Sequence, residues 1–162
     1  MTAVPLLGLY PNITPDIWPV QEFTYIAFPP GVPITPEYRR QHSIEYWTRA
    51  DPDYVDGPNT ESFRHFIGRV WNTLQRIGRL PTKTIIFTHG TFMKALIWLS
   101  MTGLRPEDIM SQKMKEFLVF DSKLDIPNTG VIKLENGKVK MLQNYPESTS
   151  PIHTADNILS EL

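Results

Sequence analysis

The 162-residue chain has no cysteine, no large excess of charge of either sign and no apolar run long enough to span a membrane. The absence of cysteine excludes disulfides, thiolate metal sites and a cysteine nucleophile, and it suits a reducing compartment. Sixteen basic and 17 acidic side chains give a net charge of -1, so no overall field attracts nucleic acid or an anionic membrane. We therefore expect a cytoplasmic protein with no nucleic-acid and no membrane partner, in which any anion site is local.

The first nine residues are apolar and contain Pro5, but they carry no basic side chain and are too short for a membrane span. We therefore do not expect these residues to be a targeting signal. Free chain ends are usually polar, whereas this start is typical of the interior of a packed helix.

The length suits one domain with a single core. Fifteen prolines lie mainly before residue 60 and after residue 125, where aromatic and aliphatic residues are interleaved with them. This mixture indicates shaped loops rather than disorder. We expect a single domain over residues 1–162, with a proline-rich lid insertion at about 28–58.

The clearest helix follows Pro58 and Asn59, where apolar residues recur at steps of three and four. This stripe consists of Phe63, Phe66, Ile67, Val70, Trp71, Leu74 and Ile77. The opposite face carries Arg64, His65, Arg69, Asn72 and Arg76, which is the pattern of an amphipathic surface helix. We therefore expect the apolar stripe to face the core and the charged face to be solvated.

The remaining elements complete an α/β pattern. Residues 21–26 alternate as a short strand, while residues 36–50 and 105–117 are predicted to be helical. The apolar run 83–88 predicts a buried parallel strand that a helix follows at once. Residues 130–135 and 138–142 flank an Asn-Gly pair and predict a hairpin. We expect a three-layer sandwich with a mostly parallel sheet, helices on both faces and an antiparallel edge hairpin.

The candidate site lies where the predicted strand 83–88 ends and the next helix begins, at residues 88–91 (Thr-His-Gly-Thr). A helix N-terminus at the carboxyl end of a strand offers N–H donors and a partial positive charge, which suit a phosphate. His89 can donate a charge-assisted hydrogen bond, and Gly90 allows the backbone to approach the ligand closely. On spacing alone, a turn with a satisfied imidazole explains the same pattern.

Five segments, in order along the chain, resemble the histidine phosphatase (phosphoglycerate mutase-like) superfamily. Residues 85–97 (IIFTHGTFMKALI) resemble the second histidine motif, and residues 18–25 (WPVQEFTY) resemble the stretch that carries the acidic residue. Three shorter matches are Thr2-Ala3, which resembles the end of an Arg-Ala-x-x-Thr-Ala helix, residues 60–63 (TESF) with Arg69-Val70, which resemble a Gly-Glu-Ser helix start, and residues 127–131 (PNTGV), which resemble an Asn-Thr-Ser strand entry.

The resemblance implies specific roles. Glu22 would be the proton donor and acceptor, and His89 the electrophile that stabilises the phosphoryl group. Gly90, Thr91 and Asn128 would bind the substrate, a small-molecule phosphate ester or inorganic phosphate, without metal or cofactor. In the family, a histidine of an Arg-His-Gly motif on the first strand receives the phosphoryl group, and water then hydrolyses the phosphohistidine.

No Arg-His-Gly triplet occurs in these residues, so the first strand is expected to be missing. Two explanations stay open: the numbering starts at an internal methionine of a longer product, which the apolar start favours, or the chain is a natural fragment without turnover. Of the other histidines, His42 and His65 are expected to be solvated, and His153 lies in a tail segment. Neither alternative fixes the oligomeric state, although unpaired strand edges would promote self-association.

Two functions therefore remain. The first is a phosphomonoester hydrolase or mutase-like phosphotransferase that works through a phosphohistidine in its full-length form. The second is a non-catalytic phospholigand-binding or scaffolding module that retains the His89 anion site. Arg39, Arg40 and Arg49 belong either to a lid over the pocket or to a solvated charged face. No metal-ligand spacing, phosphate loop or nucleophile elbow suggests another chemistry.

Overall fold

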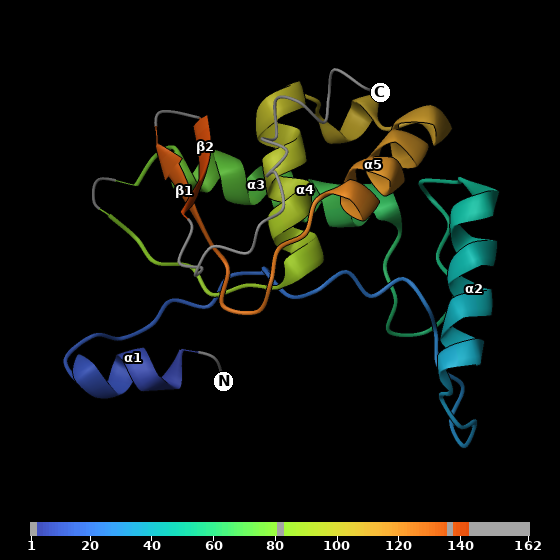
Figure 1. Cartoon of the computed structure of the whole chain (residues 1–162), viewed down its shortest axis with the longest axis horizontal. Coiled ribbons are helices and arrows are strands. Elements are labelled where there is room, and N and C mark those ends of the chain that lie inside the picture. The colour runs from blue at the N-terminus through green and yellow to red at the C-terminus, as the bar shows by residue number, and fades with distance from the viewer. Residues whose placement is uncertain (1–2, 81–82, 136–137, 143–162) are drawn as a thin grey trace, which may run out of the picture.

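The computed structural model describes residues 3–80, 83–135 and 138–142. Within these residues the chain is mainly helical, and α4 packs between α3, α5 and the hairpin strand β2 (Figure 1). The elements in chain order are α1 (Val4–Leu9), α2 (Pro36–Arg49), α3 (Phe63–Ile77), α4 (Gly90–Thr102), the 3-10 helix η1 (Pro106–Asp108), α5 (Ser111–Lys123), β1 (Val131–Glu135) and β2 (Lys138–Leu142).

The predicted helices α2, α3 and α4 form because their ends carry local stop and start signals. The Thr35 hydroxyl accepts a hydrogen bond from the Tyr38 N–H at the start of α2, and the Ser62 hydroxyl accepts one from the His65 N–H at the start of α3. Gly103 ends α4 with a φ of 67°, a conformation that glycine adopts without steric cost. These three elements confirm the sequence-based prediction.

The core is a cluster of aromatic and aliphatic side chains that α3, α4 and α5 share. Phe63, Phe66, Ile67 and Val70 of the α3 stripe are fully buried, as predicted. Phe23, from the segment before α2, stacks on Phe66 with ring centroids 4.4 Å apart. Full burial of each such side chain stabilises the fold by about 1.5–3 kcal/mol.

The predicted continuous helix over residues 105–117 is wrong. Asp108 accepts a 2.8 Å hydrogen bond from the Arg105 N–H and closes the turn η1. Ile109 then adopts an extended backbone with its side chain fully buried. Because burying Ile109 redirects the chain, α5 starts afresh at Ser111.

The sheet also differs from the prediction. In the described part of the chain the only sheet is the antiparallel hairpin, with register Val131↔Leu142 to Glu135↔Lys138. This register confirms the hairpin, whose connecting residues 136–137 lie outside the described residues. The segments 21–26 and 83–88 do not form strands, so a mostly parallel sheet is not found. Ile85 is 70% exposed, because no strand of the described chain lies beside it to cover its side chain.

The apolar chain start does form a helix, α1, but this helix buries none of its residues. The expected packing of the first nine residues therefore does not occur within the described range. No helix in the described part of the chain has both the length and the apolarity that crossing a membrane requires.

Candidate functional site

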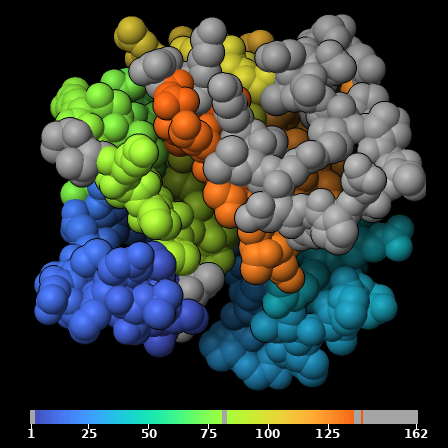
Figure 2. Space-filling view, turned by 60° about the vertical axis from the view of Figure 1, so that its left-hand side comes forward, coloured from blue at the N-terminus to red at the C-terminus, as the bar shows by residue number. Residues whose placement is uncertain are grey.

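His89 lies at the N-terminus of α4, immediately before its first residue. It has an extended backbone, with φ −117° and ψ 165°, and its side chain is exposed and makes no capping hydrogen bond. A methyl group added at Gly90 would meet no heavy atom of the other described residues within 4 Å, apart from its chain neighbours and its own helix backbone. Figure 2 shows α4 set back between the lime residues that precede it and the orange loop before β1. A helix end of this kind attracts an anionic oxygen.

The Glu22 carboxylate reaches the same helix end. Its Oε2 atom accepts a 3.3 Å hydrogen bond from the Thr91 N–H, and its Oε1 atom accepts a 2.9 Å bond from the Phe23 N–H. A carboxylate there satisfies one of the free donors of the first turn and lies at the positive end of the helix dipole. Two residues that are 67 positions apart in sequence, Glu22 and His89, therefore flank one helix terminus.

Arg69 holds the segment that carries Glu22. Its Nη1 atom donates to the carbonyl oxygens of Pro19, at 2.7 Å, and Gln21, at 3.3 Å. Its Nε atom donates a 2.8 Å bond to Glu61, and its Nη2 atom donates a second bond to the same carboxylate. Because the guanidinium is planar, it can form this two-bond pair and still reach both carbonyls.

Arg69 was predicted to lie on the solvated face of its helix, and that prediction is wrong. Only 7% of the residue is exposed, because the chain before α2 folds over this part of α3. A helical-wheel pattern cannot show such a cover. The sequence does carry one relevant signal. Glu61 and Arg69 both belong to the family-like match at residues 60–70, and their opposite charges favour an ion pair.

The opposite side of the Glu22 segment is held by the residue before His89. The Thr88 hydroxyl donates a 2.5 Å hydrogen bond to the Val20 carbonyl. Successive carbonyls therefore point to different neighbours, with residues 19 and 21 bonded to α3 and residue 20 bonded to the chain that enters α4. These contacts join the segments 19–22 and 88–91 through side chains instead of a strand ladder.

The other predicted site residues lie as follows. Thr91 is half-buried and supplies the N–H that Glu22 binds. Asn128 is exposed in the loop between α5 and β1, and Figures 1 and 2 both show this loop passing the N-terminal end of α4. Thr2 and His153 lie outside the described residues.

The remaining described histidines have structural partners. The His42 ring stacks on Tyr38 with centroids 3.8 Å apart, and its Nδ1 atom lies 2.9 Å from the Tyr38 carbonyl oxygen. His65 is exposed, with Nδ1 3.3 Å from a Glu61 oxygen. His42 is thus less solvated than predicted, because Tyr38 lies one helical turn before it and covers its ring.

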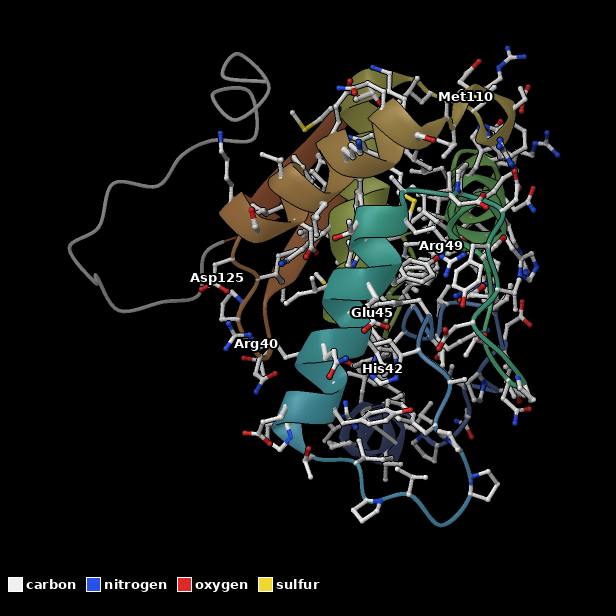
Figure 3. All side chains as sticks on the ribbon, turned by 90° about the vertical axis from the view of Figure 1, so that its right-hand side faces the viewer. Arg40, His42, Glu45, Arg49, Met110 and Asp125 are labelled. Carbon is white, nitrogen blue, oxygen red and sulfur yellow. The ribbon has the colours of Figure 1, made fainter. Side chains whose placement is uncertain are left out.

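Among residues 3–80, 83–135 and 138–142, no group of three or more His, Asp or Glu side chains could hold a metal ion. Burial raises the pKa of the Tyr46 hydroxyl above its ordinary value of 10, so this phenol stays protonated. Arg40 and Arg49 are exposed but leave α2 on different sides (Figure 3). Arg49 lies over the Tyr54 ring at 3.9 Å, and Arg39 lies over the Phe28 ring at 5.1 Å.

Comparison with known proteins gives one match. The family model of the histidine phosphatase superfamily (branch 1) matches residues 30–119, which is more than half of the chain. The matched range includes His89, Gly90 and Thr91, whereas Glu22 precedes it and Asn128 follows it. Searches of curated proteins and of solved structures found no match.

Proposed function

The chain belongs to the histidine phosphatase superfamily, and from this membership we propose that the N-terminus of α4 binds the phosphoryl group of a phosphate monoester. The proposed activity is that of a phosphomonoester hydrolase or mutase-like phosphotransferase that works through a phosphohistidine. The observation that carries the proposal is the hydrogen bond between Glu22 and the Thr91 N–H, because it puts an acid and a helix-end anion donor in direct contact beside His89.

In the proposed binding step, the phosphoryl group uses the Thr91 N–H, which binds a carboxylate oxygen of Glu22 in this structure. A phosphoryl oxygen would replace the Glu22 carboxylate at the Thr91 N–H, and the open space at Gly90 would admit the rest of the group. An N–H of the His89 ring would donate a charge-assisted hydrogen bond to a second, anionic oxygen. Asn128 is proposed to contact the ligand from the loop between α5 and β1.

The proposed chemistry gives Glu22 the proton transfers. As the phosphoryl group passes from the ester oxygen to the nucleophilic nitrogen, Glu22 donates a proton to the leaving oxygen. When water then attacks the phosphohistidine, Glu22 takes up a proton from that water, which restores the acid. The chain contains no Arg-His-Gly triplet, so the roles proposed for its own residues are binding and proton transfer.

The superfamily is α/β, and the proposal extends to the arrangement of the sheet. We propose that residues 21–26 and 83–88 pair within a mostly parallel sheet of a three-layer sandwich when a neighbouring strand covers them. The side-chain bonds between residues 20–22 and 88–91 support a position of both segments in one sheet, since they hold the start of the first segment beside the end of the second. We also propose a cytoplasmic location, and a lid role for residues 28–58.

A second candidate is a phospholigand-binding or scaffolding module without turnover. The His89 side chain is exposed and makes no capping hydrogen bond to α4 in the described part of the chain, which favours this candidate. Hydrolysis of p-nitrophenyl phosphate by the 162-residue chain and by a chain extended upstream separates the two. Turnover only in the extended chain supports the phosphotransferase, and phosphate binding without turnover in either supports the module. Equal turnover in both would place the nucleophile within these 162 residues and contradict the assigned roles.

The role of Glu22 has its own test in whichever chain turns over. An alkyl phosphate has a poor leaving group that needs the proton, whereas p-nitrophenolate leaves readily without it. Glu22→Gln should therefore lower kcat by about 10²–10⁴-fold for glycerol 3-phosphate and by much less for p-nitrophenyl phosphate. An equal loss for both esters would show that Glu22 acts in binding or folding instead of proton transfer.

A further inference from the structure

A groove of 420 Å³ lies between α2 and the segment after Glu22. It is lined by Phe23, Thr24, Tyr25, Ile26, Phe28, Arg39, Arg40 and Ser43. Ligand sites commonly have volumes of about 300–1,000 Å³. The groove is therefore large enough for a small organic group, and its walls come from two segments that the core holds in place.

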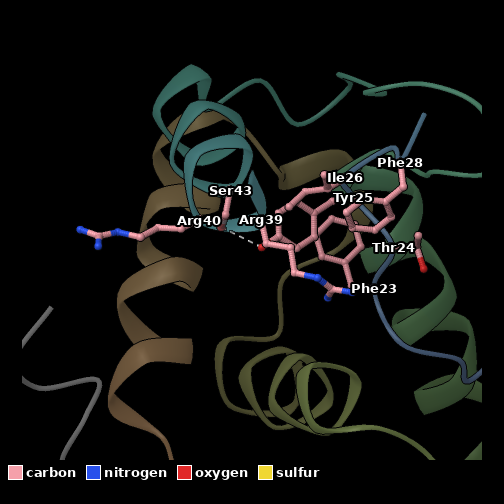
Figure 4. A pocket seen from close by; sticks show the side chains of 8 residues that line it. All are labelled: Phe23, Thr24, Tyr25, Ile26, Phe28, Arg39, Arg40 and Ser43. Atoms are coloured by element: carbon pink, nitrogen blue, oxygen red, sulfur yellow. Dashed lines mark hydrogen bonds between the residues drawn. The ribbon is translucent and has the colours of Figure 1, made fainter. Parts of the chain in front are cut away.

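The groove presents flat surfaces. Tyr25 stacks on Phe23 with ring centroids 5.0 Å apart, and Phe28 keeps 36% of its surface exposed. The Arg39 guanidinium lies over the Phe28 ring, 5.1 Å from its centroid, whereas the Arg40 side chain points away from the groove (Figure 4). Aromatic rings and a guanidinium plane bind another planar ring by stacking and by cation–π attraction.

The polar groups of the groove disfavour a sugar or polyol. None of the eight lining side chains is acidic, so nothing in the lining repels an anionic ester. The hydroxyls are those of Thr24, Tyr25 and Ser43, and the last two are hydrogen-bonded to each other at 2.9 Å. A polyol would lose its water here without gaining enough partners, and unpaired polar groups are costly.

The groove is also within reach of the proposed phosphate position. Thr24 lies two residues after Glu22, so their Cα atoms are at most about 7.6 Å apart. Glu22 is bonded to the first turn of α4. A ligand with its phosphoryl group at that turn can therefore extend its organic part toward the rings.

We propose that this groove binds the leaving group of the substrate and selects aryl phosphate monoesters over alkyl or sugar phosphates. This inference rests on the proposed function, because the phosphoryl group must lie at the α4 terminus. Phe28 and Arg39 are the specificity-determining residues, with Tyr25 as the surface behind the bound ring.

The test measures binding to the 162-residue chain by calorimetry and by amide chemical shifts. The probes are inorganic phosphate for the anion site, 1-naphthol for the groove, and 1-naphthyl phosphate and glycerol 3-phosphate for the two together. Burial of a ring should make 1-naphthyl phosphate bind about tenfold or more tightly than glycerol 3-phosphate. Phe28→Ala and Arg39→Gln should remove this preference and leave phosphate affinity unchanged. Arg49→Gln, an exposed arginine of the same helix outside the groove lining, is the matched control and should change neither.

The outcomes separate the two claims. If phosphate shifts residues 89–91 but the two esters bind equally, or 1-naphthol leaves residues 23–28 and 39–43 unshifted, the groove inference is wrong and the proposed function stands. If phosphate shifts nothing at residues 89–91, the proposed function fails, whatever 1-naphthol does. A preference that survives Phe28→Ala and Arg39→Gln would also overturn the inference, because the selectivity would then arise elsewhere.

Discussion

The guanidinium of Arg69 donates a 2.7 Å hydrogen bond to the carbonyl oxygen of Pro19, 50 residues earlier in the chain. The same group bonds the Gln21 carbonyl and the Glu61 carboxylate. This buried side chain of α3 thus holds one side of the stretch that ends at Glu22, and Thr88 holds the other. The position of the proposed acid depends on this anchor, since no regular strand holds residues 19–22.

Removing the Arg69 side chain should lower the stability of the folded protein. Arg69→Met leaves the Glu61 carboxylate and two carbonyls without their partner, so the free energy of unfolding should fall by about 3–5 kcal/mol. Arg76→Met, on the exposed side of the same helix, should cost less than about 1 kcal/mol, although it also breaks an ion pair with Asp16. Urea denaturation measures both. Equal losses in the two variants would contradict the role assigned to Arg69.

The aromatic core provides a second prediction. Phe66 is fully buried and stacks on Phe23, so Phe66→Ala should destabilise the protein by about 3–5 kcal/mol through lost contacts and a residual cavity. Phe28→Ala removes an exposed ring and should cost far less. Thermal unfolding of the two variants checks this ranking, and it also establishes that the Phe28 variant used as a binding probe is folded.

The ion pair between Asp53 and Arg64 predicts a dependence of stability on pH. Hydrogen bonds from Arg64 lower the pKa of Asp53 below its ordinary value of 3.8 in the folded protein. As the pH falls, the unfolded chain, in which Asp53 has its ordinary pKa, takes up the proton before the folded protein does. The stabilisation from the ion pair is therefore complete above pH 3.8 and is lost as the pH falls through the lowered pKa. The gap in unfolding free energy between the wild type and Asp53→Asn should shrink between about pH 6 and about pH 2.5. A constant gap would refute the pairing.

The exposed apolar segment before α4 should promote self-association. Ile85 and Phe87 belong to an extended stretch whose side chains face solvent, and such a stretch is a template for pairing with another chain. Ile85→Lys should therefore lower the fraction of oligomer seen by sedimentation velocity. Ile44→Lys, at an exposed position of helix α2, is the control and should leave the fraction unchanged. An equal effect of both substitutions would attribute association to general hydrophobicity.

Local signals in the sequence were sufficient to predict α2, α3, α4 and the hairpin. Thr35 and Ser62 cap α2 and α3, and the α3 stripe is buried as its spacing indicates. The strands predicted at residues 21–26 and 83–88 do not form in the described structure. Alternation or apolarity indicates which side chains of a strand would be buried, but it does not supply the neighbouring strand that stabilises it. The break at Ile109 likewise depends on a burial site that distant residues form.

The candidate site was only partly accessible from the sequence. The His-Gly pattern at residues 89–90 predicted a helix start, and α4 begins at Gly90. The contact of Glu22 with that helix end followed from family resemblance, since no spacing links residues 22 and 91. Arg69 was misassigned because its partners include the carbonyls of Pro19 and Gln21, and the sequence gives no sign of where a backbone carbonyl will lie.

The most direct test of the central claim is a titration of the 162-residue chain with inorganic phosphate, followed by the amide signals of Gly90 and Thr91 and the ring signals of His89. A phosphate site at the start of α4 predicts saturable shifts at these three residues, weakened by His89→Ala and unaffected by the control His65→Ala. Absence of saturable shifts at residues 89–91, or identical titrations of the wild type and His89→Ala, would contradict it.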